Sequence, residues 1–222
     1  MANDLAAMVS RIAAEIARPD LAGAIGSSGN GPAIRNAIND AIYICQKFRF
    51  RFNEAIPPTG VTFNTVIGQS LYAPAGILSI DYLGTVAGDG SFLNIARSQP
   101  ELVKLLASQS GTPDSFAMEG EKIILAPVPS TIITINVFGH ILLAAPASDG
   151  EVGNRWMTDG ERMVRFLAKR EVARNVTRNK EMDAAMDAAW MSERDNLISE
   201  AGRLLLFQQQ QMRQLNVPPE PR

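Results

Sequence analysis

The feature that most constrains the fold is a change of hydrophobic periodicity along the chain, from helical to strand-like and back. In the middle, residues 111–129 predict a strand, a tight turn at Glu119-Gly120-Glu121 and a returning strand. The second strand ends at Pro127 and Pro129, which cannot donate ladder hydrogen bonds. A β-hairpin is therefore predicted at the centre of a chain whose two ends have helical patterns.

The N-terminal part, residues 1–56, predicts two helices. The first covers residues 3–17, with Asn3 as its N-cap and a stop at Arg18-Pro19. The second follows Pro32 and continues to about Phe50. The buried positions expected in these helices recur at three- and four-residue steps: Leu5, Val9, Ile12, Ile16, Ile34, Ile38, Ala41, Ile42 and Cys45.

Residues 48–52, Phe-Arg-Phe-Arg-Phe, alternate aromatic and basic side chains after the second helix. This pattern indicates either a transition to extended chain or an aromatic anchor against the neighbouring layer. We favour packing over stacking of these aromatics on nucleic-acid bases.

The middle part, residues 57–146, predicts a β domain. It begins after Pro57-Pro58 and Gly60, where the periodicity approaches two. A short helix over residues 98–107 is predicted from the capping-box spacing of Ser98 and Glu101, and it would cover one side of the sheet. Residues 88–90, Gly-Asp-Gly, predict a tight turn. The expected strands are 61–66, 70–73, 78–86, 92–95, 115–118, 122–125 and 132–141.

Residues 154–207 predict long C-terminal helices that follow Trp156 and break near Asn179, so that two helices form an antiparallel hairpin. From Gln208 the sequence loses its apolar face and becomes proline-rich, which predicts an extended tail over residues 208–222. The expected fold class is α+β: a helical bundle formed by the N- and C-terminal helices, with an inserted antiparallel β domain that is a sandwich or a small barrel.

Composition argues against an enzyme. Cys45 is the only cysteine and His140 the only histidine, so an intramolecular disulfide, a cysteine metal site and a paired-histidine site are excluded. His140 lies in an apolar strand without a nucleophile motif nearby, which indicates a structural role. Asp81 and Asp114 are a conceivable glycosidase pair, but carboxylates at turns and strand edges are common. The sequence predicts no cofactor.

Other compositional features restrict the partners. Residues 84–90 lack the lysine and hydroxyl residue of a phosphate-binding loop, and they predict a hairpin turn. Residues 55–154 carry three basic against eight acidic side chains, which argues against a general nucleic-acid binder. No segment reaches the roughly 20 apolar residues of a membrane span. Because no secretory signal is evident, we expect synthesis in the cytoplasm.

Two surfaces are predicted to mediate assembly. One is the basic flank of the helix at 161–178, which is either an ordinary solvated face or, repeated around a ring, a ring or channel interface. The other is the C-terminal tail, which is either a simple disordered end or a segment whose apolar anchors order on a partner. The basic residues are Arg162, Arg165, Lys169, Arg170, Arg174 and Arg178. The tail residues are Gln208, Met212, Arg213, Leu215, Val217, Pro218 and Arg222.

In this order of parts the chain resembles the head-to-tail adaptor, or connector, proteins of tailed bacteriophages, particularly short-tailed ones. The resemblance covers most of the chain. It is carried by the order of several short motifs: Ile34-x-x-Ala37-Ile38-x-x-Ala41, Phe63-x-Thr65-x-x-Gly68-Gln69-x-x-Tyr72, Ile80-Asp81-Tyr82, the hairpin at 111–129, and Trp156 before the last helices.

The resemblance implies a non-enzymatic structural protein of the virion neck. It implies a ring, usually of twelve copies, that binds beneath the portal protein, carries the tail nozzle or tube on its other side and leaves a channel for DNA passage. The C-terminal segment of such adaptors reaches toward the portal, which assigns residues 208–222 to portal binding. Two other readings stay open. One is a different neck or head-completion protein, and the other is a tail-associated protein that binds or hydrolyses polysaccharide.

Overall fold

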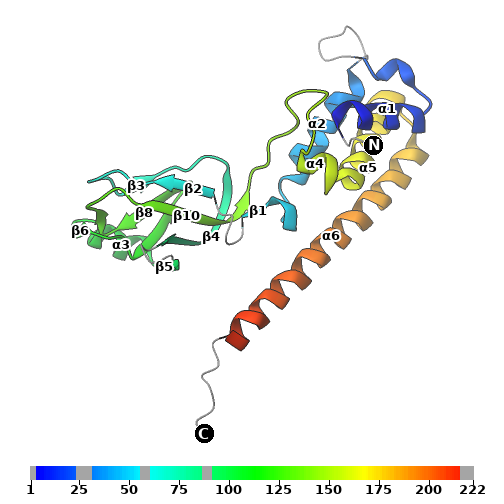
Figure 1. Cartoon of the computed structure of the whole chain (residues 1–222). Coiled ribbons are helices and arrows are strands. Elements are labelled where there is room, and N and C mark those ends of the chain that lie inside the picture. The colour runs from blue at the N-terminus through cyan, green and yellow to red at the C-terminus, as the bar shows by residue number, and fades with distance from the viewer. Residues whose placement is uncertain (1–3, 24–31, 56–60, 87–91, 216–222) are drawn as a thin grey trace. The chain divides into compact units, whose positions relative to one another are not determined.

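The computed structural model describes residues 4–23, 32–55, 61–86 and 92–215, apart from the side chains of Phe92 and of residues 204–215. The chain forms two compact units (Figure 1). The helical unit contains residues 1–52 and 143–222, and the β unit contains residues 53–142. The predicted limits of the β domain, 57 and 146, lie a few residues later. The predicted turn at 88–90 lies outside the described residues.

The helical unit begins with α1 (Leu5–Glu15) and α2 (Ala33–Cys45), separated by the short helix η1 (Pro19–Leu21). Asp4 is the N-cap of α1 and accepts a hydrogen bond from the Ala7 amide at 2.7 Å, so the prediction of Asn3 as N-cap is wrong by one residue. Helix α2 ends at Cys45 rather than near Phe50, because in the segment that follows the aromatic side chains face the core and the arginines between them face solvent.

The C-terminal part of the helical unit contains α4 (Arg155–Thr158), α5 (Glu161–Val172), the π-helical turn η3 (Ala173–Thr177) and α6 (Lys180–Leu215). Arg178 has a left-handed backbone conformation with φ of 53°, and Asn179 caps α6 through a 3.0 Å bond to the Met182 amide. This confirms the predicted break near Asn179. Helix α6 continues through Leu215, so the first part of the segment predicted as a tail is helical.

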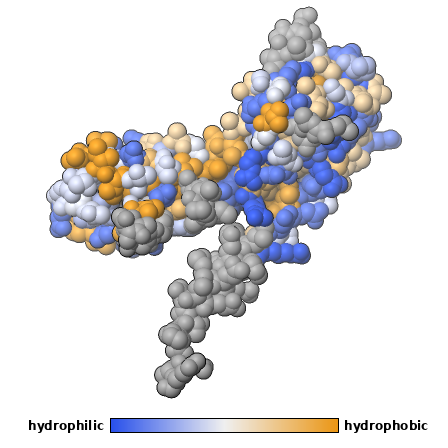
Figure 2. Space-filling view, in the orientation of Figure 1, coloured by the Kyte–Doolittle hydropathy of each residue, from blue (hydrophilic) through white to orange (hydrophobic). Residues whose placement is uncertain are grey.

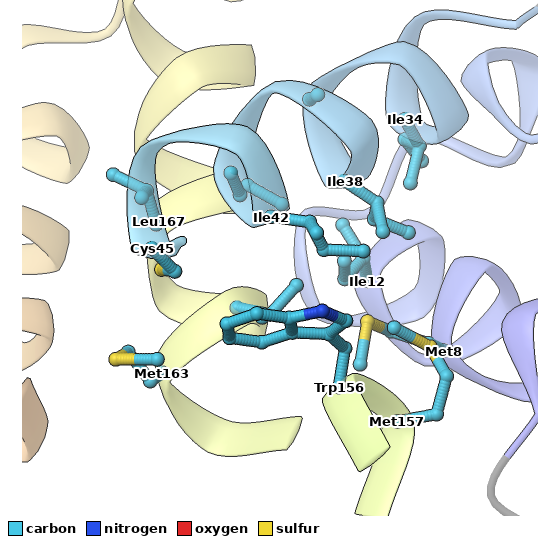
Figure 3. Close-up of a cluster of buried hydrophobic side chains, with 14 of the residues drawn as sticks. Met8, Ile12, Ile34, Ile38, Ile42, Cys45, Trp156, Met157, Met163 and Leu167 are labelled. Carbon is cyan, nitrogen blue, oxygen red and sulfur yellow. The ribbon is translucent and has the colours of Figure 1, made fainter. Parts of the chain in front are cut away.

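One hydrophobic core joins both ends of the chain in the helical unit. Figure 3 shows Trp156 beneath the apolar face of α2, with Met8 and Ile12 of α1 on one side. The Trp156 ring contacts the Phe52 ring edge-on at 5.1 Å, and Phe52 stacks on Phe50 at 5.3 Å. The packing role predicted for the aromatic residues at 48–52 is therefore confirmed, and so is the bundle of N- and C-terminal helices.

The β unit contains one curled sheet with strand order β1-β10-β4-β5-β7-β8-β3, and β2 also pairs with β10. The strands are β1 (Glu54–Ala55), β2 (Val61–Asn64), β3 (Leu71–Tyr72), β4 (Ile77–Val86), β5 (Phe92–Arg97), β7 (Ser115–Glu119), β8 (Lys122–Ala126) and β10 (Thr134–Ile141). The short strands β6 (Ser110–Gly111) and β9 (Val128–Pro129) form a separate parallel pair.

The free edges of β2 and β3 approach each other through side chains, since the Phe63 and Tyr72 rings lie 5.1 Å apart. The Tyr72 hydroxyl also donates to the Gln69 carbonyl at 2.7 Å and to the Val66 carbonyl at 3.1 Å. The sheet therefore resembles a small, partly open barrel. The α+β fold with an antiparallel-rich sheet is confirmed.

One strand pairing differs from the prediction. Strands β5 and β7 are parallel, and α3 (Pro100–Leu106) connects them. A parallel pair needs such a crossover connection, whereas a hairpin turn can only join antiparallel strands. Val103 of α3 packs on Ala117, Ile124 and Ala126, so the helix covers one face of the sheet as predicted. The predicted capping box is wrong, because Gln99 is the N-cap and makes no side-chain capping bond.

Candidate functional site

The residues considered for catalysis occupy structural positions. His140 is 6% exposed in β10, and its Nε2 lies 3.0 Å from the Asn53 side-chain nitrogen. Asp81 lies in β4, whereas Asp114 precedes β7 and bonds through its backbone to Ala96 and Ala126. In the part of the chain that the structure describes, no three histidine, cysteine or carboxylate side chains gather as a metal site.

The basic flank of α5 is largely occupied by ion pairs within the helical unit. Arg165 contacts Glu15 of α1 at 2.5 Å and Glu161 at 3.0 Å. Lys169 contacts Glu15 at 2.9 Å and is only 8% exposed. Arg174 contacts Asp183 of α6 at 3.1 Å. These pairs connect α5 to α1 and η3 to α6, so part of the predicted ring or channel interface also holds the helices together.

Three of the six basic side chains of this flank keep substantial exposure. The Arg162 side chain is 66% exposed and lies 4.0 Å from Glu193, and that of Arg174 is 50% exposed. Arg178 is exposed at the turn between α5 and α6. These three remain candidates for contact with another surface, whereas Arg165 and Lys169 form ion pairs with Glu15.

The carboxylate of Glu15 is stabilised by both of the cations that pair with it. Burial alone would raise the pKa of its carboxyl, but the hydrogen bonds and positive charges of Lys169 and Arg165 lower the pKa below the ordinary value. The carboxylate form is therefore favoured in the folded protein. Because Arg165 and Lys169 both pair with Glu15, they hold α5 against α1 and do not form a free anion-binding surface.

Arg35 forms a second set of hydrogen bonds that connects distant parts of the chain. It is 6% exposed, and its guanidinium donates to both Asp149 carboxylate oxygens at 3.1 and 2.6 Å. It also donates to the Ala22 carbonyl at 2.8 Å and the Gly23 carbonyl at 2.5 Å. The Asp149 carbonyl accepts from the Ala6 amide at 3.1 Å. Residues before α4 are thereby fixed to α1 and α2.

We expect Asp149→Asn to destabilise the helical unit by about 1 kcal/mol at pH 7, because a buried guanidinium loses its charged partner. The bond to Arg35 lowers the pKa of Asp149 below 3.8, although burial opposes this. A lowered pKa stabilises the folded state above the ordinary value and loses that contribution as the pH falls below it. The gap between wild type and variant, measured by urea unfolding, should therefore shrink below about pH 4.

Asp20→Asn is the matched control. Asp20 also receives two bonds from an arginine, Arg18, at 2.9 and 2.8 Å, but the pair is exposed and local. Its removal should leave the unfolding midpoint unchanged. Equal effects of the two variants would contradict the structural role of the Arg35 pair.

Cys45 is buried at the end of α2 and is chemically protected. Burial raises the pKa of its thiol from 9.0 to about 12, and only weak opposing effects come from Trp190 and Arg170. The Trp190 Nε1 is buried without a hydrogen-bond partner among the described residues, since sulfur is a weak acceptor. Arg170 and Arg194 lie over the Trp190 ring at 5.3 and 5.1 Å.

We expect native protein to resist thiol alkylation at pH 8, because a shift of this size leaves about a thousandfold less thiolate and burial blocks the reagent. Mass spectrometry after treatment with iodoacetamide should show unmodified native protein and one modification in urea. Rapid labelling of the native chain would show that the helical core opens around Cys45.

The structure does not describe the side chains of the predicted portal-binding residues. Gln208, Met212, Arg213 and Leu215 lie on the C-terminal part of α6, where the backbone alone is described. Val217, Pro218 and Arg222 lie outside the described residues. This surface stays a prediction.

The β unit has an aliphatic surface that its sequence pattern did not predict. Thr85 of β4 pairs with Leu93 and Ile135, and the Thr65 amide donates to the Ile133 carbonyl, so these segments meet at one end of the sheet. A depression of about 470 Å³ there is lined by residues of β4, of β10 and of the segment just before β10. Figure 2 shows orange hydrophobic side chains on the surface of this unit. The hydrophobic side chains of these segments that are at least half exposed are Val66, Ile67, Val86, Leu93 and Ile132.

Comparison with known proteins agrees with a structural role. The family model described as SU10 adaptor protein matches residues 3–221. A search of the curated proteins found no match. Within the described ranges, none of the helices has both the length and the apolar character to cross a membrane. The match covers nearly the whole chain and agrees with the resemblance to phage head-to-tail adaptors, and we conclude that the chain belongs to the SU10 adaptor protein family.

Proposed function

We propose that the protein is a head-to-tail adaptor of a tailed phage virion. It forms a ring beneath the portal protein, of the twelve copies usual for such adaptors, and connects the portal to the tail nozzle or tube. DNA passes through the channel of the ring without sequence-specific binding. The observation that carries this proposal is the adaptor family match over residues 3–221.

Features of both units support a structural, non-enzymatic role. The ionisable side chains considered for catalysis are buried, paired within the fold or dispersed. The helical unit provides a rigid body, in which Arg162, Arg174 and Arg178 are exposed cations at the candidate ring or channel face. The β unit exposes an aliphatic end, which suits a protein partner on the tail side.

Helix α6 supports the assignment of the C-terminal segment to portal binding. Leu197 is the last described side chain of α6 that packs on the main core of the helical unit, and Ala201 is the last that is buried, yet the helix continues to Leu215. The backbone of α6 thus extends about 21 Å past Ala201, and helices in proteins gain most of their stability from tertiary packing. A contact with the portal would supply such packing.

Deletion of residues 208–222 should give a folded subunit that no longer binds portal rings of the same phage. Light scattering should show that the complete chain adds the mass of a ring to the portal, while the shortened chain adds none. Unchanged tryptophan fluorescence would verify folding, because Trp156 and Trp190 both lie in the helical unit. Portal binding by the shortened chain would refute the assignment of the tail, and a complete chain that ignores the portal would refute the adaptor function.

A further inference from the structure

Two long stretches, which lie largely in the β unit, contain no charged residue. Residues 55–80 and residues 123–148 have 26 positions each, and none of these is Asp, Glu, Lys or Arg. Charged residues make up 20% of the chain, so each stretch would be expected to contain about five. The two stretches also lie together, because β10 pairs with β2 and with the first part of β4, and β8 pairs with β3. One region of the β unit is therefore free of charged side chains.

Two loops at one end of this region, residues 65–70 and residues 129–133, form what we call the tip. The Thr65 amide donates to the Ile133 carbonyl at 2.9 Å, and the Ile133 amide donates to the Thr65 hydroxyl at 2.9 Å. The Tyr72 hydroxyl bonds to backbone atoms of the first loop at 2.7 and 3.1 Å. These bonds hold the tip in one conformation, so a partner that binds it does not have to order the loops.

The tip exposes aliphatic side chains. Val66, Ile67 and Ile132 are each more than half exposed. The depression of about 470 Å³ is continuous with the tip, since Ile132 and Ile133 belong to its lining. The polar residues of that lining are all uncharged: Thr85, Thr134 and Asn136. The surface of a soluble domain usually contains about 25–35% charged residues, so an aliphatic surface without charge is typical of a protein–protein contact.

We propose that the tip binds an uncharged, apolar surface of the tail nozzle or tube protein. This inference rests on the proposed function, in which the C-terminal segment binds the portal and the tail protein is the other partner. The absence of charge determines the chemistry of the partner surface. A charged group that faced the tip would lose its water without gaining an opposite charge, so the contact surface of the partner must be uncharged as well.

The symmetry and size of the tip favour the tail protein over a second copy of this chain. Two identical tips that packed on each other would form a closed two-fold pair, which does not continue into a ring.

The tip also contains only eleven residues, whereas one side of a specific protein contact usually contains about 20–30. A single tip therefore binds weakly. A nozzle or tube that continues the DNA channel surrounds the same axis as the ring, so it meets the tips of several copies at once and binds them with a higher overall affinity.

Aspartate substitutions at the tip test this contact. Rings of Ile67→Asp/Ile132→Asp should form on the portal as usual, as measured by light scattering. Their affinity for the tail nozzle or tube protein of the same phage should fall at least about a hundredfold, because the contact would bury unpaired charges. Ile67→Thr/Ile132→Thr removes apolar surface without adding charge and should lower the affinity about tenfold. Hydrogen exchange of β4 and β10 would verify that the β unit stays folded.

Leu78→Asp is the matched control. Leu78 is also an aliphatic residue of the β unit and is about half exposed. It lies eight positions before Val86 in β4, about 26 Å along the strand from the depression beside the tip. Its substitution should leave tail binding unchanged.

Three results would contradict the proposed contact. Normal tail binding by the aspartate double variant would overturn the docking surface, and so would an equal loss in Leu78→Asp. Loss of the portal-bound ring in the double variant alone would show that the tip contacts a neighbouring copy instead of the tail protein. If unaltered rings do not bind the tail protein, the proposed function fails first.

Discussion

Replacing Gly139 with alanine should unfold the β unit and leave the helical unit folded. Gly139 lies in β10 at a register shift and has a φ of +149°, a conformation that side chains other than glycine rarely adopt. An added Cβ would lie 2.3 Å from the Ser79 carbonyl oxygen and 3.0 Å from the Asp81 amide nitrogen. Both are backbone atoms of the paired strand, so no side-chain rotation relieves the clash.

The expected destabilisation is about 3–5 kcal/mol, which combines backbone strain with overpacking and approaches the whole stability of a small domain. Hydrogen exchange read by mass spectrometry should show loss of protection in β4 and β10. Tryptophan fluorescence should show an unchanged transition, because both tryptophans belong to the helical unit.

Gly120→Ala is the control for Gly139→Ala. Gly120 also has a positive φ, +61°, but an added Cβ would meet no atom within 4 Å. It should cost only about 1 kcal/mol for the left-handed conformation. Similar losses at the two positions would show that the approach of β10 to β4 is looser than described.

Replacing Trp156 with alanine should destabilise the helical unit by about 3–5 kcal/mol, the usual range for removing a buried tryptophan. Trp156 is fully buried between α1, α2 and α5, and its ring meets Phe52 edge-on. Its Nε1 donates to the Leu143 carbonyl at 3.1 Å. The loss would remove packing and a hydrogen bond at the point where the chain returns from the β unit.

Trp156→Phe separates these two contributions. It keeps most of the aromatic packing, and the Leu143 carbonyl retains its bond from the Gln46 amide group. A loss of about 1 kcal/mol is expected. Urea unfolding followed by the remaining Trp190 fluorescence measures both variants. A large loss of unfolding free energy in the Trp156→Phe variant would mean that the hydrogen bond to Leu143, rather than the volume of the ring, stabilises this part of the helical unit.

Elements with strong hydrophobic periodicity were predictable from sequence. The helix stripes through Leu5, Val9 and Ile12 and the strands around the 115–126 hairpin are present in the structure. These patterns succeed because burial of one face is decided locally by residue spacing. Helix ends were less predictable, since the caps Asp4 and Gln99 compete with equally suitable neighbours.

Features that depend on distant contacts could not be derived from the sequence. The parallel pairing of β5 with β7 requires knowledge of how the chain crosses through α3. Glu15 holds Arg165 and Lys169 from 150 and 154 positions away, so the basic flank of α5 looked freer in sequence than it is. A glycine in a strand does not reveal its φ, which is why Gly139 was not singled out.

The discontinuous helical unit has a consequence for the order of folding during synthesis. The β unit is a continuous segment, so it is complete once Leu142 has left the ribosome. Helices α1 and α2 emerge earlier, yet the residues that cover their apolar faces, Trp156 and Leu167 among them, are made last. The apolar faces of α1 and α2 therefore stay uncovered until the end of translation. These Ile-rich helices are the part of the chain most in need of chaperone protection.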